Sequence, residues 1–153
     1  MGKGKLSDLV NRELVNLRTL NEPNSFFGVD LGEDKYIVPS CYSIMNRASS
    51  SHVMLNWQLE ASNDRINYEI LDTRVFLTND INTNKELEKE REMLKEPGCT
   101  STWGIDPGFK DKFPKGFRYF LIKHIGRNSS GSYNMAISGL EIYGNANGSG
   151  WYF

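Results

Sequence analysis

The sequence predicts an all-β fold in which two antiparallel layers form a sandwich, with one short helix inserted between strands. Short segments rich in aromatic and β-branched residues recur along the chain, each bounded by Gly, Pro, Asn or Ser, which is typical of strands joined by turns. Bulky and polar side chains alternate within them, as expected when one face of a sheet is buried. The 153 residues, 39% of them hydrophobic, are enough for one domain with its own core.

Seven segments have the composition and length of strands: 26–31, 36–45, 54–61, 68–77, 100–105, 117–125 and 135–143. In the third, Trp57, Leu59 and Ala61 alternate with polar residues, which predicts one buried face. Segment 117–125 has bulky residues at both odd and even positions, so we expect this strand at the centre of a sheet. We expect the side chain of Tyr119, like that of Trp57, to lie between the two layers. A glycine inside the last segment, Gly139, indicates a bulge or a close backbone approach.

Three segments lie outside this pattern. Residues 82–97 contain the capping box of Thr83 and Glu86, are mostly charged and end at Pro97 and Gly98, which predicts a short, solvent-facing helix. Residues 1–20 fit either a helix with an apolar stripe or an extended edge strand, and both interpretations stay open. Residues 145–153 follow a Gly/Asn/Ser-rich exit, so we expect a flexible tail. The sandwich itself is therefore expected over residues 21–144.

Charge and hydropathy exclude several classes of protein. The net charge of −1 gives no overall field that would attract nucleic acid or an anionic membrane. No apolar run approaches the roughly 20 residues that span a bilayer. The basic first residues are followed by a polar segment rather than by the apolar core of a signal peptide. We therefore expect an intracellular, cytoplasmic protein in which Cys41 and Cys99 are reduced.

Motifs for catalysis or for a cofactor are absent from the sequence. It contains no Walker loop, no dinucleotide-binding glycine pattern, no His-Glu-x-x-His and no Cys-x-x-Cys. His52 and His124 lie near serines, but no spacing indicates a carboxylate that would orient either histidine or an oxyanion hole. The sequence therefore predicts a protein that is not an enzyme and that needs no cofactor.

Two local clusters have competing interpretations. The carboxylates of segment 30–34 are of the kind that Ca²⁺ binds, but Asp30 within an apolar strand is better explained as an acceptor of backbone or arginine hydrogen bonds. Segment 110–127 interleaves basic and aromatic residues, as in single-strand nucleic-acid grooves. Aromatics that alternate within a strand are more often core residues, with lysines beside them for solubility. We expect neither a metal site nor nucleic-acid binding.

Seven blocks, taken in their order and spacing, resemble the discoidin-like, galactose-binding-like domain family: 24–32, 38–44, 55–64, 97–103, 118–122, 126–131 and 138–144. The branch that they resemble most is the intracellular one, found in HECT-type ubiquitin ligases and BTB-domain proteins. Two departures stand out. Arg65 and Tyr68 replace the Gly and Trp that usually follow the motif at Ser62, and residues 6–20 match the family's first strands poorly. We expect a reshaped turn, and a domain that is trimmed or is completed by a strand of another chain.

The resemblance implies an eight-stranded jelly-roll β-sandwich that binds ligands with loops at one end. If segment 135–143 runs toward the chain end, the loop 126–134 lies at the opposite pole, away from the termini. The loop 46–53 joins it if the strand before it runs the same way. The ligand-binding candidates on these loops are Arg47, Ser50, His52, Arg127, Asn128, Ser129, Ser130 and Tyr133. The competing interpretation is that the Asn and Ser residues only supply turn geometry.

Two functional hypotheses follow. The first is a non-catalytic module that binds a protein or peptide, or has an architectural role, within a larger intracellular assembly such as a ubiquitin ligase. The alternative is a carbohydrate-binding, lectin-like module of a secreted or surface protein. Only the alternative predicts a disulfide between Cys41 and Cys99 and glycosylation of the sequons at Asn128 and Asn147.

Overall fold

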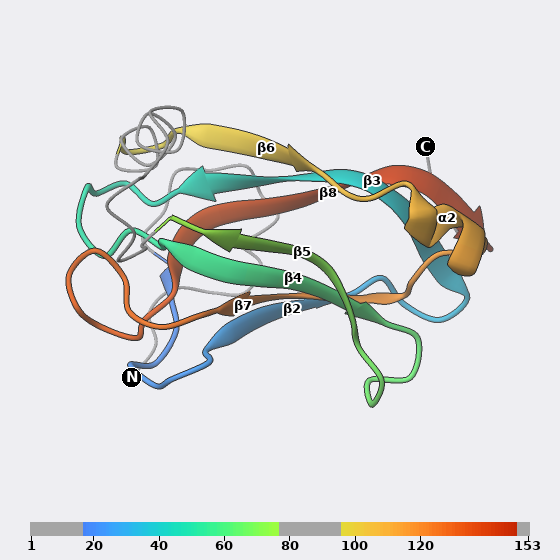
Figure 1. Cartoon of the computed structure of the whole chain (residues 1–153), viewed down its shortest axis with the longest axis horizontal. Helices are drawn as coiled ribbons and strands as arrows, with labels where there is room; N and C mark the ends of the chain where they lie inside the picture. The colour runs from blue at the N-terminus through green and yellow to red at the C-terminus, as the bar shows by residue number, and fades with distance from the viewer. Residues whose placement is uncertain (1–16, 77–95, 150–153) are drawn as a thin grey trace.

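The computed structural model describes residues 17–76 and 96–149, which form eight strands and one short helix (Figure 1). The strands are β1 (Leu17–Arg18), β2 (Phe26–Asp30), β3 (Lys35–Asn46), β4 (Asn56–Ser62), β5 (Glu69–Val75), β6 (Thr100–Gly104), β7 (Tyr119–His124) and β8 (Ala136–Gly148), and the helix is α2 (Gly108–Lys112). Every predicted strand is present. The expected helical insertion, 82–97, lies almost entirely outside the described residues, whereas α2 was not predicted.

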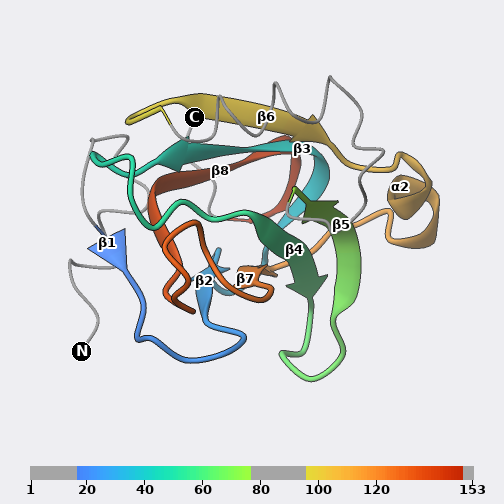
Figure 2. The ribbon, with the colours of Figure 1, turned by 60° about the vertical axis from the view of Figure 1, so that its left-hand side comes forward.

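The strands form two four-stranded antiparallel sheets that face each other (Figure 2). Sheet A has the order β1-β8-β3-β6 and sheet B the order β2-β7-β4-β5. Consecutive strands therefore cross repeatedly from one sheet to the other, as in a jelly roll. Strand β7 lies between β2 and β4, which confirms the central place predicted for segment 117–125.

Aromatic side chains fill the space between the sheets. Trp57 is fully buried, as predicted, and its ring lies 5.3 Å from that of Phe76 and 5.0 Å from that of Trp103. The prediction for Tyr119 was wrong: this side chain lies on the outer face of sheet B, and Phe120 takes the buried position instead. Bulky residues occupy both the odd and the even positions of segment 117–125, so alternation alone did not decide which face of the strand is buried.

A buried hydrogen-bond chain links the two sheets. The Trp57 indole N–H donates to the Tyr42 hydroxyl at 2.9 Å, and this hydroxyl donates to Asp72 Oδ2 at 2.7 Å. Arg74 Nε donates to the same carboxylate oxygen at 2.8 Å. The chain thus satisfies the polar atoms of two core aromatics, which would otherwise cost free energy on burial. Burial and the neighbouring carboxylate raise the pKa of Tyr42, so its hydroxyl stays protonated.

Strand β8 continues beyond the point at which a flexible exit was predicted. The expected tail begins at residue 145, but β8 runs through Gly148 and pairs with the first residues of β3. Two glycines permit this pairing, because a Cβ on Gly144 would lie 1.9 Å from Val38 O and one on Gly148 would lie 1.9 Å from Asp34 O. The predicted irregularity at Gly139 is confirmed. Gly139 pairs with Met45, and the register between β3 and β8 shifts between this pair and the next pair along the strands.

The N-terminal segment enters sheet A as a strand. Leu17 and Arg18 pair with Ile137 and Ala136 of β8, so these two residues follow the extended interpretation rather than the helical one. Residues 1–16 lie outside the described part of the chain. No helix among the described residues is long and apolar enough to cross a membrane.

Both cysteines are free thiols. Cys41 pairs with Gly104 at one end of the β3–β6 ladder. Cys99 lies at the other end, directly before Thr100, which pairs with Met45. The two cysteines are therefore separated along the ladder by roughly 17 Å, at about 3.3 Å per residue. A disulfide requires Cα atoms within about 7 Å. The disulfide predicted by the secreted alternative is therefore excluded.

Candidate functional site

Two loops from different strands meet at one end of the sandwich, on the left in Figure 1. Residues 47–55 lead from β3 to β4, and residues 125–135 lead from β7 to β8. Each loop crosses from one sheet to the other. We call this pole the loop end, and the opposite pole, which carries α2 and the 63–68 turn, the helix end. The sequence left open whether the two loops lie at the same pole. They do, because β3 is antiparallel to β8, so the loop after β3 and the loop before β8 lie at the same end.

The loops are joined by hydrogen bonds between hydroxyls and backbone. Ser129 Oγ accepts the N–H of Val53 at 2.9 Å, and the N–H of Ser129 donates to Val53 O at 3.0 Å. Ser130 Oγ accepts the N–H of His52 at 2.9 Å. His52 itself has a positive φ of 57°, a conformation that these contacts help to hold. The two serines thus fix the relative position of the loops, and each hydroxyl still has a proton to donate.

Asn128 organises the 125–135 loop from within. Its side-chain oxygen accepts the N–H groups of Ser130 and Ser132 at 3.0 and 3.1 Å, and its Nδ2 donates to Asn134 O at 2.9 Å. The residue is only 3% exposed, so its polar atoms serve the turn, as in the competing interpretation. The sequon at Asn128 is therefore closed to a glycan in the folded chain.

The segment that precedes β2 forms a third part of the loop end. Thr19 O accepts Asn134 Nδ2 at 2.9 Å, Thr19 Oγ1 accepts the N–H of Met135 at 2.9 Å, and Asn21 Oδ1 accepts the N–H of Tyr133 at 2.8 Å. The prediction that the 126–134 loop lies away from both chain ends was therefore only half right. It is opposite the C-terminal end of β8 but hydrogen-bonded to the N-terminal segment, which has no motif that signals this contact.

Serines, two arginines, a histidine and a tyrosine supply most of the polar side chains of the loop end. Arg127 lies over the Tyr133 ring, 4.5 Å from its centroid, and donates to Gly131 O at 2.7 Å. His52 Nδ1 lies 3.1 Å from Ser51 Oγ, and Ser50 is exposed. Arg47 is half-buried, and burial together with the charge of Arg18 lowers its pKa. These groups can donate hydrogen bonds to carbonyls, carboxylates or hydroxyls of a ligand.

His124 supports this end from the core. It is fully buried, and its Nδ1 donates to Tyr133 O at 3.0 Å. Its Nε2 is buried and has no hydrogen-bond partner among the described residues. Burial lowers the pKa of this imidazole, so His124 is a neutral structural residue at physiological pH. It ties the 125–135 loop to β7.

Groups for catalysis are not assembled at the loop end. In residues 17–76 and 96–149 no carboxylate hydrogen-bonds to His52 or His124, and no cluster of three or more His, Cys, Asp or Glu side chains could hold a metal ion. At the helix end, Asp30 is occupied as predicted: it accepts Arg118 Nε at 2.7 Å and Arg65 Nη2 at 3.0 Å. The Arg118 hydrogen bond dominates in lowering the pKa of Asp30 to about 2.

The aromatic residues of the basic segment 110–127 divide between core and surface. Phe117 and Phe120 are buried, and Phe113 packs against Phe117 with its ring 4.7 Å away. The rings of these three residues pack against other side chains and are therefore not available to stack on bases. This agrees with the preferred interpretation of the segment as core aromatics flanked by solubilising lysines.

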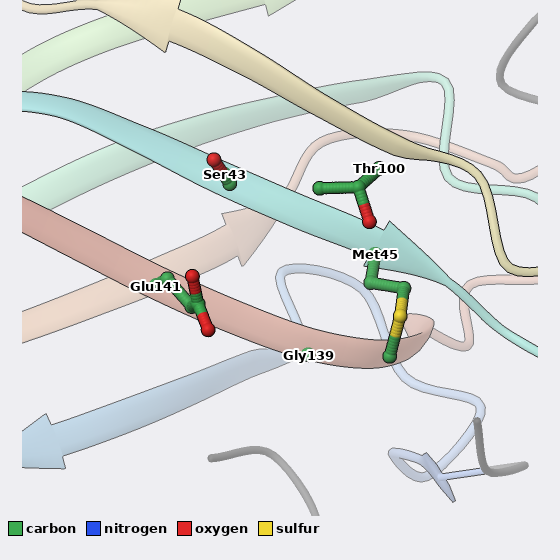
Figure 3. A pocket seen from close by; sticks show the side chains of 5 residues that line it. All are labelled: Ser43, Met45, Thr100, Gly139 and Glu141. Atoms are coloured by element: carbon green, nitrogen blue, oxygen red, sulfur yellow. The ribbon is translucent and has the colours of Figure 1, made fainter. Parts of the chain in front are cut away.

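A separate hollow of about 230 Å³ lies on the outer face of sheet A. Figure 3 shows the residues that line it: Ser43 and Met45 of β3, Thr100 of β6, and Gly139 and Glu141 of β8. Ser43 Oγ is 2.6 Å from Thr102 Oγ1, so its hydroxyl is already used across the strands. The hollow is small and lies beside the end of β3 and the start of β8, next to the loop end, and sequence analysis did not indicate it.

Comparison with solved structures decides the fold type. CBM62 from Clostridium thermocellum Xyl5A superimposes with a TM-score of 0.61 at 16% identity, covering 98% of this chain and 94% of that one. A fucose-binding module from Streptococcus pneumoniae gives a TM-score of 0.60 at 16% identity, covering 94% of this chain and 84% of that one. The chain has the discoidin-like, galactose-binding-like fold. The lectin domain of lectinolysin, complexed with the Lewis b antigen, has this fold too (TM-score 0.54, 13% identity, 93% and 85% covered).

Sequence comparison relates this discoidin-like chain to part of a much larger protein. It is 32% identical over 145 residues to the E3 ubiquitin-protein ligase hecd-1 of Caenorhabditis elegans, a match that covers 92% of this chain. The chain spans only 5% of the length of that ligase. No protein-family model matches the chain. The solved structures named above are two carbohydrate-binding modules and a lectin domain that share this fold.

Proposed function

We propose that this discoidin-like domain is a non-catalytic recognition module that holds a protein or peptide segment at its loop end, within an intracellular assembly of the ubiquitin-ligase type. The observation that supports this most is the joining of two loops from different strands by Ser129 and Ser130. A surface fixed in this way loses little conformational entropy when it binds. The similarity to a segment of the ubiquitin ligase hecd-1 supports an assembly of the ubiquitin-ligase type.

The groups on this surface favour a peptide over a sugar. Arg127 already covers one face of the Tyr133 ring, a face on which a pyranose would otherwise stack. Its guanidinium keeps further N–H groups for carbonyl or carboxylate acceptors. His52 and Ser50 add short polar contacts beside it. In this proposal Asn128, Ser129 and Ser130 position the loops, while Arg47, Ser50, His52, Arg127 and Tyr133 contact the partner.

Partner capture with charge-reversed chains tests this proposal. The full chain, bearing Arg47→Glu and Arg127→Glu, is compared with a matched control bearing Lys110→Glu and Lys115→Glu at the helix end. Far-UV circular dichroism first establishes that both variants fold. We expect the loop-end variant to lose partners that the wild type and the control retain. Identical partner sets for all three chains would remove the loop end from consideration.

Carbohydrate binding is the second candidate, because the solved neighbours include a fucose-binding module and a lectin domain. It is tested separately by titrating fucose and the Lewis b antigen into the wild-type chain and following the amide resonances of the 125–135 loop. We expect no saturable shifts. Saturable shifts that disappear in Arg127→Glu would favour a lectin-like function over peptide recognition.

A further inference from the structure

Strand β2 is an edge of sheet B with a free side; it lies at the lower margin of the sandwich in Figure 1. The flanking bonds from His124 N to Ser25 O and from Leu31 N to Arg118 O show that odd-numbered residues of this segment bond to β7. The N–H and C=O groups of Phe26, Gly28 and Asp30 therefore point away from β7. Among the described residues nothing hydrogen-bonds to these groups.

This edge lacks the features that usually prevent pairing with another chain. Natural edge strands are typically interrupted by Pro, Lys or a bulge. Strand β2 has the sequence Phe-Phe-Gly-Val-Asp and keeps a regular register with β7 throughout. The other edge of sheet B differs, because β5 carries the charged residues Asp72 and Arg74 and its register with β4 shifts. Strand β2 is therefore the edge of this sheet that is suited to accept a strand.

A groove of about 540 Å³ runs along β2 on the outer face of the sheet. Gly28 and Leu121 lie at its middle, and Phe26, which is 59% exposed, lies at one end. Gly28 has no positive φ, and a Cβ placed there would meet only Phe120 O, at 3.7 Å. Neither backbone conformation nor packing requires a glycine at this position. Its effect is to leave room for the side chain of an added strand.

The other end of the groove carries an exposed arginine. Arg65 and Arg118 both bond to Asp30, and both guanidiniums lie over the Tyr119 ring, at 4.5 and 4.8 Å from its centroid. Arg118 also experiences the charge of Glu33, so Arg65 is the cation at this end of the groove that an occupant can approach. The Arg65 side chain is 60% exposed, so most of its N–H groups face solvent. A carboxylate on the occupant would complement this end.

We propose that β2 is a docking edge for an extended segment of a protein partner. The segment adds as a strand outside β2, bonds to the free backbone groups of Phe26, Gly28 and Asp30, places an apolar side chain in the groove over Gly28 and sets a carboxylate beside Arg65. The backbone bonds supply affinity, and the groove with its charged end supplies selectivity. The proposal uses no residue of the loop end, so it stands or fails independently of the function proposed there.

The test uses two glycine-to-valine variants of the full chain. Gly28→Val fills the groove, whereas Gly104→Val is the matched control on edge strand β6, where a Cβ would meet nothing within 4 Å. The probe is a synthetic peptide recovered from a random display library selected on the wild-type chain. We expect Gly28→Val to weaken its binding by about tenfold or more and Gly104→Val to leave it unchanged. Arg65→Ala should weaken only peptides with an acidic residue.

Hydrogen exchange on the wild-type chain provides a measurement that needs no variant. Bound peptide should newly protect the amides of Phe26, Gly28 and Asp30, while Phe27 and Val29 are already protected by β7. A library that yields no peptide able to do this would overturn the proposal, as would binding that Gly28→Val leaves intact. Protection of these amides in the free chain, with a dimer detected by sedimentation, would instead assign the edge to a second copy and also overturn it.

Discussion

Ser129 and Val53 hold each other through a reciprocal pair of hydrogen bonds across the loop end. The Ser129 hydroxyl accepts the N–H of Val53, and the N–H of Ser129 donates to the Val53 carbonyl. Val53 is only 3% exposed, so water cannot easily replace the serine oxygen. The contact joins two loops that are 76 residues apart in the chain.

Ser129→Ala tests how much this contact contributes to the stability of the folded chain. The substitution leaves a buried N–H unsatisfied, so we expect it to lower the free energy of unfolding by about 1–3 kcal/mol. Urea unfolding followed by circular dichroism measures the change. Ser130→Ala is the control: the His52 N–H that it frees lies in a more exposed loop, so its cost should be smaller. Equal effects of the two variants would contradict the assignment of Ser129 as the main contact between the loops.

Tyr42→Phe tests the buried hydrogen-bond chain that links the sheets. Removing the hydroxyl leaves the Trp57 N–H without its acceptor in a fully buried site. We expect a loss of about 1–3 kcal/mol in the free energy of unfolding, with a changed tryptophan fluorescence in the folded state. Tyr36→Phe, at a half-buried tyrosine of the same strand, is the matched control and should be nearly neutral. A stable Tyr42→Phe chain would show that water reaches the Trp57 indole.

Local patterns in the sequence predicted the strands because each strand has one apolar face. Trp57 shows this directly, since its neighbours at even positions are polar and only one orientation buries the odd ones. The pattern does not decide the orientation of Tyr119, because bulky residues occupy both the odd and the even positions of that strand. Arg65, from a distant turn, covers the Tyr119 ring. The last residues of β8 have the composition of a loop, and only their pairing with β3 makes them a strand.

The sequence predicted candidate residues on two loops but left open whether these loops meet, and it did not predict the division of roles. The structure places the loops of Arg47 and Arg127 at the same pole, because β3 and β8 are antiparallel. Burial then separates Asn128, which serves the turn, from Arg127, which faces solvent. Nothing in the sequence indicates that Thr19 closes the loop end, since that contact depends on three-dimensional proximity of the N-terminal segment.

Gly144→Ala tests the close approach of β8 to β3. The added Cβ would lie 1.9 Å from Val38 O, so a strand must shift, and we expect a cost of about 1–3 kcal/mol or more. Thermal unfolding measures this, with Gly104→Ala as the control at a strand glycine whose Cβ position is open. Gly104→Ala should be neutral or slightly stabilising, because alanine restricts the unfolded chain. If both variants behave alike, the two strands are not held as closely as described.

The buried histidine predicts how stability depends on pH. Burial lowers the pKa of His124 below the ordinary histidine value of about 6.5, so as the pH falls below about 6.5 the unfolded chain takes up a proton that the folded chain does not. Folding stability should therefore decrease as the pH falls from 6.5 to 5, with a slope that approaches about 1.4 kcal/mol per pH unit for one proton. Above about pH 8 the histidine is neutral in both states and contributes no slope.

Urea unfolding at pH 7, 6 and 5 measures this dependence. His124→Phe removes the titrating group while keeping a flat ring in the site, so its stability should change much less over the same range. His52→Asn is the control, because His52 lies in the surface loop and Asn readily adopts its positive φ. This variant should keep the wild-type slope. A wild-type chain with no slope between pH 6.5 and 5 would mean that the protonated imidazole finds an acceptor for its Nε2 hydrogen.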